Sequence, residues 1–127
     1  MIVDTSVIVA LAMREASREW IHAALAARGS ERLRMSCVNI AETGMVLERC
    51  APGSAAGLHK ALAAIGIEPL DSDAQVVDAA VKARARFPLN FGDCFAYAHA
   101  LLRQEALITL DDDFLATDLP SIVHPER

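Results

Sequence analysis

The chain has 127 residues, which fits one domain and is enough to bury roughly two-thirds of the surface that its unfolded form would expose. Hydrophobic residues make up 54% of it with few aromatics, which suits helices packed on a sheet better than a β-sandwich. A formal net charge of -5 argues against a broad basic field for nucleic acid, but not against an enzyme that meets phosphates through bound cations.

We treat residues 1–127 as a single domain. No apolar run approaches the roughly 20 residues of a membrane span, and no basic-then-apolar leader opens the chain, so we expect a cytoplasmic protein without membrane contact. The cysteines Cys37, Cys50 and Cys94 lie in apolar stretches without CxxC spacing, which favours neither a disulfide framework nor a zinc site. We expect all three to be small core residues.

The opening run Met1 to Val3 is typical of a short buried strand, and a short helical pattern follows it from about residue 7. Apolar periodicity then predicts helices at about residues 17–28, 39–49, 55–65, 72–87 and 90–105, and strands at 33–37, 67–70, 107–110 and 122–123. Gly66 has the place of a left-handed helix C-cap.

Strands that alternate with helices of this length imply right-handed crossovers and a parallel sheet that is covered on both faces. We therefore predict an α/β protein with three layers, α/β/α, around a central parallel sheet of four to five strands.

Two acids follow predicted strands. Asp4 and Asp111 each stand at a strand's carboxyl end, where ligands bind in open α/β sheets. Asp4 also precedes a helical pattern, so a role as an N-cap is as good an interpretation of that residue alone. By spacing we expect Asp111 to point into the same crevice as Asp4, with Asp113 close behind it and Asp112 turned away.

Two further acids lie on predicted helices. Glu42 stands on a helix that is apolar on several sides, where a carboxylate needs a partner or a cation, although an outward, solvated position stays open. Asp93 comes three residues after Asn90, so Asn90 could cap the helix and Asp93 could be a first-turn acid favoured by the helix dipole.

Convergence of Asp4, Glu42, Asp93 and Asp111 in one cleft would raise some of their pKa values or demand a metal ion. Hard oxygen ligands without a nearby Cys or His cluster select Mg²⁺, with Mn²⁺ as a possible substitute. Such a site suits phosphoryl chemistry, in which a cation binds a phosphate and activates a water.

Several motifs together resemble the VapC toxins, a group of PIN-domain ribonucleases from toxin–antitoxin pairs. They are Ile2-Val3-Asp4-Thr5-Ser6, the Glu42 helix with Val46-Leu47-Glu48-Arg49, Leu89-Asn90-Phe91-Gly92-Asp93-Cys94-Phe95-Ala96-Tyr97-Ala98, and Asp111-Asp112-Asp113-Phe114 followed by Thr117-Asp118. The resemblance runs the whole length of the chain in order.

The resemblance implies a site. Its catalytic acids would be Asp4, Glu42, Asp93 and Asp111, and its metal ligands would be these four together with Asp113. The family's hydroxyl after the first acid matches Thr5 or Ser6, which could orient water or a carboxylate. The resemblance further implies a Mg²⁺-dependent endoribonuclease that cleaves structured RNA such as transfer RNA, works as a homodimer and is held inactive by a cognate VapB-type antitoxin.

The chain departs from its relatives in two places. Phe87-Pro88 leads straight into the Leu89 block without a longer basic loop, and Thr109-Leu110 replaces a strand end that bears lysine. Two other hypotheses remain: a catalytically inactive PIN-fold module that binds an antitoxin or RNA, and an aspartyl-phosphate phosphatase. The phosphatases usually place a second Asp two residues after the first, where this chain has Ser6.

Overall fold

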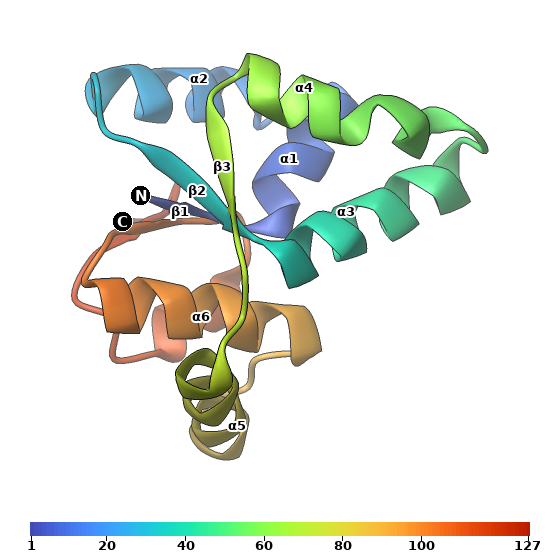
Figure 1. The fold of residues 1–127 in the computed structure, drawn as a ribbon. Coiled ribbons are helices and arrows are strands. Elements are labelled where there is room, and N and C mark those ends of the chain that lie inside the picture. The colour runs from blue at the N-terminus through green and yellow to red at the C-terminus, as the bar shows by residue number, and fades with distance from the viewer.

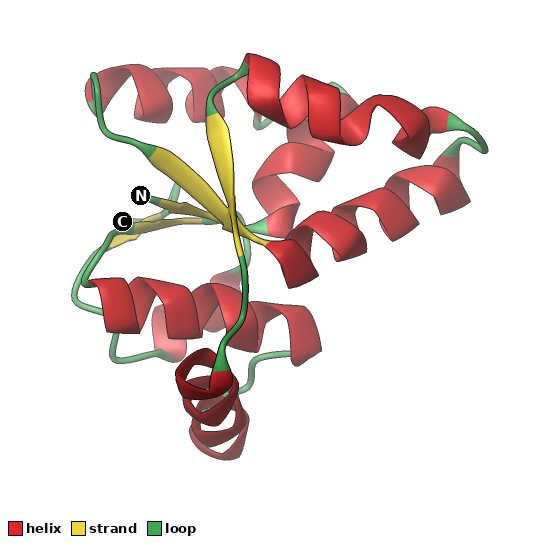
Figure 2. Ribbon diagram, in the orientation of Figure 1, coloured by secondary structure: helices red, strands yellow, loops and turns green.

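The computed structural model describes residues 1–127 and places a five-stranded parallel sheet at the centre of the molecule. The strands are β1 (Ile2–Val3), β2 (Leu33–Ser36), β3 (Ile67–Leu70), β4 (Leu107–Ile108) and β5 (Ile122–Val123). Their order across the sheet is β3-β2-β1-β4-β5, and each neighbouring pair is parallel. Figure 2 shows the yellow strands between two groups of red helices. The predicted α/β/α class is therefore confirmed.

The helices divide between the two faces of the sheet. They are α1 (Thr5–Ala12), α2 (Arg18–Ala27), α3 (Cys37–Cys50), α4 (Leu58–Ala64), α5 (Ala74–Arg86) and α6 (Phe91–Arg103), with short 3-10 helices η1 (Ser54–Gly57) and η2 (Asp112–Ala116). Helices α1 to α4 cover one face, and α5 and α6 cover the other (Figure 1). None of these helices has the length and apolar character that crossing a bilayer requires.

The central strands supply side chains to both apolar layers. Ile2 and Leu107 pack in the core beneath α5 and α6, whereas Val3 and Ile108 pack in the core beneath α1 to α4. This alternation is the period-two pattern of a strand that is buried on both faces. Strands β1 and β4 are therefore buried on both faces, and they lie in the interior of the sheet.

Helix α3 begins earlier than predicted. Ser36 ends β2 and caps α3, since its hydroxyl accepts the N–H of Val38 at 3.2 Å. The helix therefore starts at Cys37 rather than at residue 39. Cys37 and Cys50 lie at its two ends and are exposed, so the prediction that all three cysteines are core residues is wrong for these two and confirmed for Cys94.

Two other helices differ from the predicted ranges, one because of a glycine and one because of a capping hydrogen bond. The predicted helix 55–65 is divided into η1 and α4 at Gly57, whose ψ of 6° departs from helical geometry. Helix α5 begins at Ala74 rather than at residue 72, because Asp73 caps it by accepting the N–H of Val76 at 2.9 Å. Gly66 takes the predicted left-handed conformation with φ +79°.

The strand order creates a switch point beside β1. The chain passes from β1 outward through β2 to β3, and then returns to add β4 and β5 on the opposite side of β1. Ligands in open α/β sheets bind beyond the carboxyl ends of the strands at such a point. The backbone N–H of Asp4 donates to the carbonyl of Ile108 at 3.1 Å, so the residues that follow β1 and β4 lie side by side.

Candidate active site

Asp4 stands at the end of β1 and is also the N-cap of α1, so both sequence interpretations of this residue describe its position. Only 1% of the residue is exposed. Its Oδ2 accepts three hydrogen bonds, from the Ser6 N–H (3.3 Å), the Ser6 hydroxyl (2.6 Å) and the Thr109 hydroxyl (2.9 Å). Its Oδ1 is buried and has no partner at all. One oxygen is therefore held in place while the other is available to a cation.

The hydroxyls of Ser6 and Thr109 link the ends of β1 and β4. Ser6 Oγ accepts the N–H of Leu110 at 3.0 Å, and Thr109 Oγ1 accepts the N–H of Asp111 at 3.0 Å. Each hydroxyl can then give its proton to Asp4. The N–H of Thr109 still donates to the Val123 carbonyl at 3.1 Å, but the N–H groups of Leu110 and Asp111 bond to side chains, so strand pairing does not extend to the predicted residue 110.

Thr109 was missed by the sequence reasoning as a site residue. The sequence indicates Thr109 only as a departure from a strand end that bears lysine. The available signal was a hydroxyl at a strand end, two residues before an acid, in register with the end of β1. Thr5 takes another place: its hydroxyl donates to the Asn39 carbonyl at 3.3 Å and accepts from the Asn39 amide at 3.2 Å. Of the two hydroxyls that follow Asp4, Ser6 is the one that contacts the carboxylate.

Glu42 reaches the site from the middle of α3 and packs against Gly92 in the first turn of α6. A Cβ added at Gly92 would overlap the Glu42 carboxylate, with Cδ at 2.7 Å and Oε1 at 2.8 Å. The Asn39 amide donates to the Gly92 carbonyl at 3.1 Å and so ties α3 to α6 at this point. The absence of a side chain at Gly92 therefore makes the space in which Glu42 lies.

Asp93 both completes a helix cap and lies in the cleft. Its Oδ2 accepts the N–H of Asn90 at 3.1 Å while Asn90 Oδ1 accepts the N–H of Asp93 at 3.0 Å, a capping box. Only 3% of Asp93 is exposed. Capping α6 and serving as an acid of the site are thus compatible roles for Asp93, since the cap fixes the carboxylate that faces the other acids.

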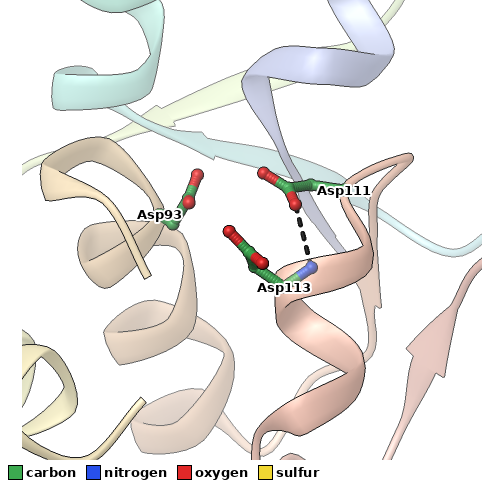
Figure 3. Close-up of side chains that lie close together, drawn as sticks. All are labelled: Asp93, Asp111 and Asp113. Atoms are coloured by element: carbon green, nitrogen blue, oxygen red, sulfur yellow. Dashed lines mark hydrogen bonds between the residues drawn. The ribbon is translucent and has the colours of Figure 1, made fainter. Parts of the chain in front are cut away.

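Asp111 and Asp113 face Asp93 across the cleft. Figure 3 shows the three carboxylates close together. One oxygen from each lies within 4.8 Å of the others. Asp111 Oδ1 accepts the N–H of Asp113 at 2.9 Å and caps η2. Asp112 does not join the group, because its carboxylate lies 3.2 Å from His124 Nε2. This separation matches the predicted orientation of the three consecutive acids.

The acids meet in one cavity of about 450 Å³. It is lined by Asp4, Thr5, Ser6, Glu42, Met45, Val46, Arg49, Asn90, Asp93 and Asp111. The structure therefore brings Asp4, Glu42, Asp93 and Asp111 together, and it places Asp113 beside them rather than in the cavity wall. The expected convergence arises from four elements, β1, α3, α6 and the loop after β4.

The acids disfavour one another's ionised forms. Burial raises the pKa of Asp4, although the hydrogen bonds from Ser6 and Thr109 oppose the rise. The pKa of Asp93 rises to about 7, because of burial first and then the negative charge of Asp4, with smaller effects from Asp111 and Glu42. A divalent cation would offset this repulsion, and the unpartnered Asp4 oxygen and the hard donors around it fit one.

Comparison with known proteins gives a match to a family and matches to individual relatives. The family model described as the PIN domain matches residues 1–119. The chain is similar to Ribonuclease VapC30 of Mycobacterium tuberculosis, with 32% identity over 135 residues that cover 98% of this chain and 100% of that protein.

Solved structures share the fold. VapC20 of Mycobacterium tuberculosis, described as a sarcin-ricin loop cleaving toxin, has a TM-score of 0.78 at 20% identity over 93% of this chain and 95% of that one. VapBC2 of Rickettsia felis, bound to a DNA fragment from its promoter, has a TM-score of 0.76 at 13% identity over 97% and 96%. At these identities the likeness concerns the fold alone.

Proposed function

Because the chain belongs to the PIN domain family, and within it to the VapC ribonucleases, we propose that its acidic cavity holds Mg²⁺ and hydrolyses a phosphodiester bond in RNA. The chain acts as the toxin component of a type II toxin–antitoxin system. The observation that carries this proposal is the convergence of four acids on one cavity, with a buried Asp4 oxygen that has no partner.

The residues that would hold the cation are Asp4, Glu42, Asp93 and Asp111, with Asp113 at the edge of the group. Carboxylate oxygens are the ligands of Mg²⁺ and of its substitute Mn²⁺. When bound, the cation would offset the charge of the scissile phosphate and lower the pKa of an attacking water.

The chain's own residues prepare the site for that chemistry. Ser6 and Thr109 hold Asp4 through one oxygen and so fix the direction of the other. Asn90 fixes Asp93 through the capping box, and Gly92 leaves room for the Glu42 carboxylate. Asp93, with its pKa raised to about 7 in the metal-free protein, would release a proton when it binds the cation near neutral pH.

The substrate that we propose is structured RNA such as transfer RNA, in the cytoplasm. The similar VapC20 is described as a sarcin-ricin loop cleaving toxin, which supports an RNA substrate for the fold. The net charge of -5 means that affinity for the RNA comes from local contacts and the bound cation rather than from a basic surface.

A VapB-type antitoxin and a second copy of the chain are the proposed protein partners. An apolar groove of about 500 Å³ runs between α1, α2 and α4, and its lining includes Ile8, Leu11, Leu58, Leu62 and Ile65. This groove suits the apolar side of an antitoxin segment, and the VapBC2 structure of Rickettsia felis supports such a pairing.

Exposed Val77, Val81 and Phe91 on α5 and α6 offer a face for the homodimer. Residues 1–127 form one PIN domain in this proposal, since β5 pairs with β4 beyond the matched region.

Incubation with total transfer RNA tests the proposal. Protein freed of any co-purifying antitoxin is expected to give discrete fragments in Mg²⁺ or Mn²⁺ and none in EDTA. Because water rather than a ribose hydroxyl attacks, the fragments should carry no 2′,3′-cyclic phosphate. Equal cleavage in EDTA, or cyclic phosphate ends, would contradict the proposal. An absence of cleavage by folded protein in either cation would favour the inactive binding module.

A further inference from the structure

Arg49 is the one cationic side chain that lines the acidic cavity, and the proposed chemistry does not use it. It shares a face of α3 with Glu42, Met45 and Val46, because residues at i, i+3, i+4 and i+7 lie on one side of a helix. A rise of 1.5 Å per residue places Arg49 about 10.5 Å along α3 from Glu42. The guanidinium therefore belongs to the outer part of the cavity, beyond the acids.

The charge of Arg49 has no partner within the protein. No carboxylate lies within 4.0 Å of its guanidinium, whereas Arg28, Arg34, Arg86 and Arg103 all form ion pairs. The adjacent Glu48 is occupied, since its two oxygens accept the N–H groups of Gly53 at 2.7 Å and Ala55 at 3.3 Å. Arg49 is exposed and available to an anion from outside.

We propose that Met45, Val46 and Arg49 form a subsite for the nucleotide next to the scissile phosphate, in which the Arg49 guanidinium binds the neighbouring backbone phosphate. This inference rests on the proposed ribonuclease function. A guanidinium matches a phosphate through two parallel hydrogen bonds. Met45 is 72% exposed, and with Val46 it gives an adaptable apolar wall for the ribose or base. The RNA strand then leaves the acids along α3.

A structural role is the competing explanation for Arg49. It lies in the last turn of α3, where a cation complements the helix dipole. That role predicts a change in thermal stability when the charge is removed, with no change in the salt dependence of RNA binding. The two explanations therefore differ in their measurable consequences.

Steady-state cleavage of total transfer RNA in Mg²⁺ separates them. Arg49→Gln should raise KM about tenfold, as expected for loss of a charge-assisted hydrogen bond, and leave kcat within about twofold. Arg49→Lys should keep part of the affinity. Arg32→Gln is the matched control. Arg32 is exposed, forms no ion pair and precedes β2, so it lies at the amino ends of the strands, away from the cavity at their carboxyl ends. This variant should leave both constants unchanged.

Binding of total transfer RNA to the Asp93→Asn protein is then measured by filter retention over a series of salt concentrations. Adding Arg49→Gln to that protein should reduce the slope of log Kd against log salt by about one. An unchanged KM and slope, or a loss of kcat at constant KM, would overturn the proposal. Failure of the unsubstituted protein to cleave RNA would instead refute the ribonuclease function, and the binding slopes would still decide the role of Arg49.

Discussion

Replacement of Asp93 with Asn is expected to reduce the rate of RNA cleavage on the order of a thousandfold. The amide keeps an oxygen that can accept the Asn90 N–H, so the cap of α6 survives, but it removes a negative charge and an anionic ligand from the cavity. The loss should therefore be in activity rather than in fold.

The same substitution should stabilise the metal-free protein at neutral and alkaline pH. The pKa of Asp93 is about 7 in the folded protein and near its ordinary 3.8 when unfolded, so between these values the folded state binds more protons. The free energy of unfolding thus falls as the pH rises from about 4 to 7. This ionisation costs about 4 kcal/mol, and Asn removes it.

Urea unfolding in EDTA at pH 4.5 and pH 8 measures this effect. The Asp93→Asn protein should exceed the unsubstituted protein in stability at pH 8 and lose less stability between the two pH values. Asp112→Asn is the matched control for both rate and stability. It removes the same charge from the residue next to Asp111, but the Asp112 carboxylate lies beside His124 rather than among the other acids. Equal behaviour of the two variants would show that the position of Asp93 has no special role.

Gly92→Ala should reduce cleavage about a hundredfold while the protein stays folded. The new Cβ would occupy the place of the Glu42 carboxylate, which must then swing away from the cavity. The backbone of Gly92 does not have a positive φ, and alanine favours a helix over glycine by about 1 kcal/mol. Stability should therefore be retained or rise slightly as activity falls.

Gly57→Ala is the control for a glycine replacement, because a Cβ there meets no atom within 4 Å. It should leave cleavage unchanged. If the effect of Gly92→Ala acts through Glu42, then the double variant Gly92→Ala with Glu42→Gln should be no slower than Glu42→Gln alone. Full activity of Gly92→Ala, or additive losses in the double variant, would contradict this account of the packing.

Much of the architecture could be predicted because it depends on local pattern. The positions of Asp4 and Asp111 after short apolar strands placed them at one sheet edge, and the pairing of β1 with β4 brings those strand ends together. Asp112 and Asp113 begin η2, where consecutive side chains point about 120° apart, so Asp112 faces His124 while Asp113 faces Asp93. Such features can be predicted from the periodicity of the side chains and the direction of the strands alone.

Other features depend on how distant elements meet, and the pattern of one element could not predict them. The role of Gly92 arises where α3 crosses the start of α6, and neither helix alone indicates it. Thr109 contacts Asp4 only because β4 lies beside β1. Cys37 was misplaced because the cap at Ser36 starts α3 at that residue, and Cys50 because it is the last residue of α3; both ends of the helix are exposed.

Calorimetric titration of the metal-free protein with Mn²⁺ at pH 7.5 tests most directly that the converged acids hold a cation. The unsubstituted protein and Asp112→Asn should bind Mn²⁺ with the same affinity and release protons, whereas Asp4→Asn should weaken binding at least about tenfold by removing the unpartnered oxygen. Equal affinity in Asp4→Asn and the unsubstituted protein, or a loss confined to Asp112→Asn, would contradict the assignment of the site.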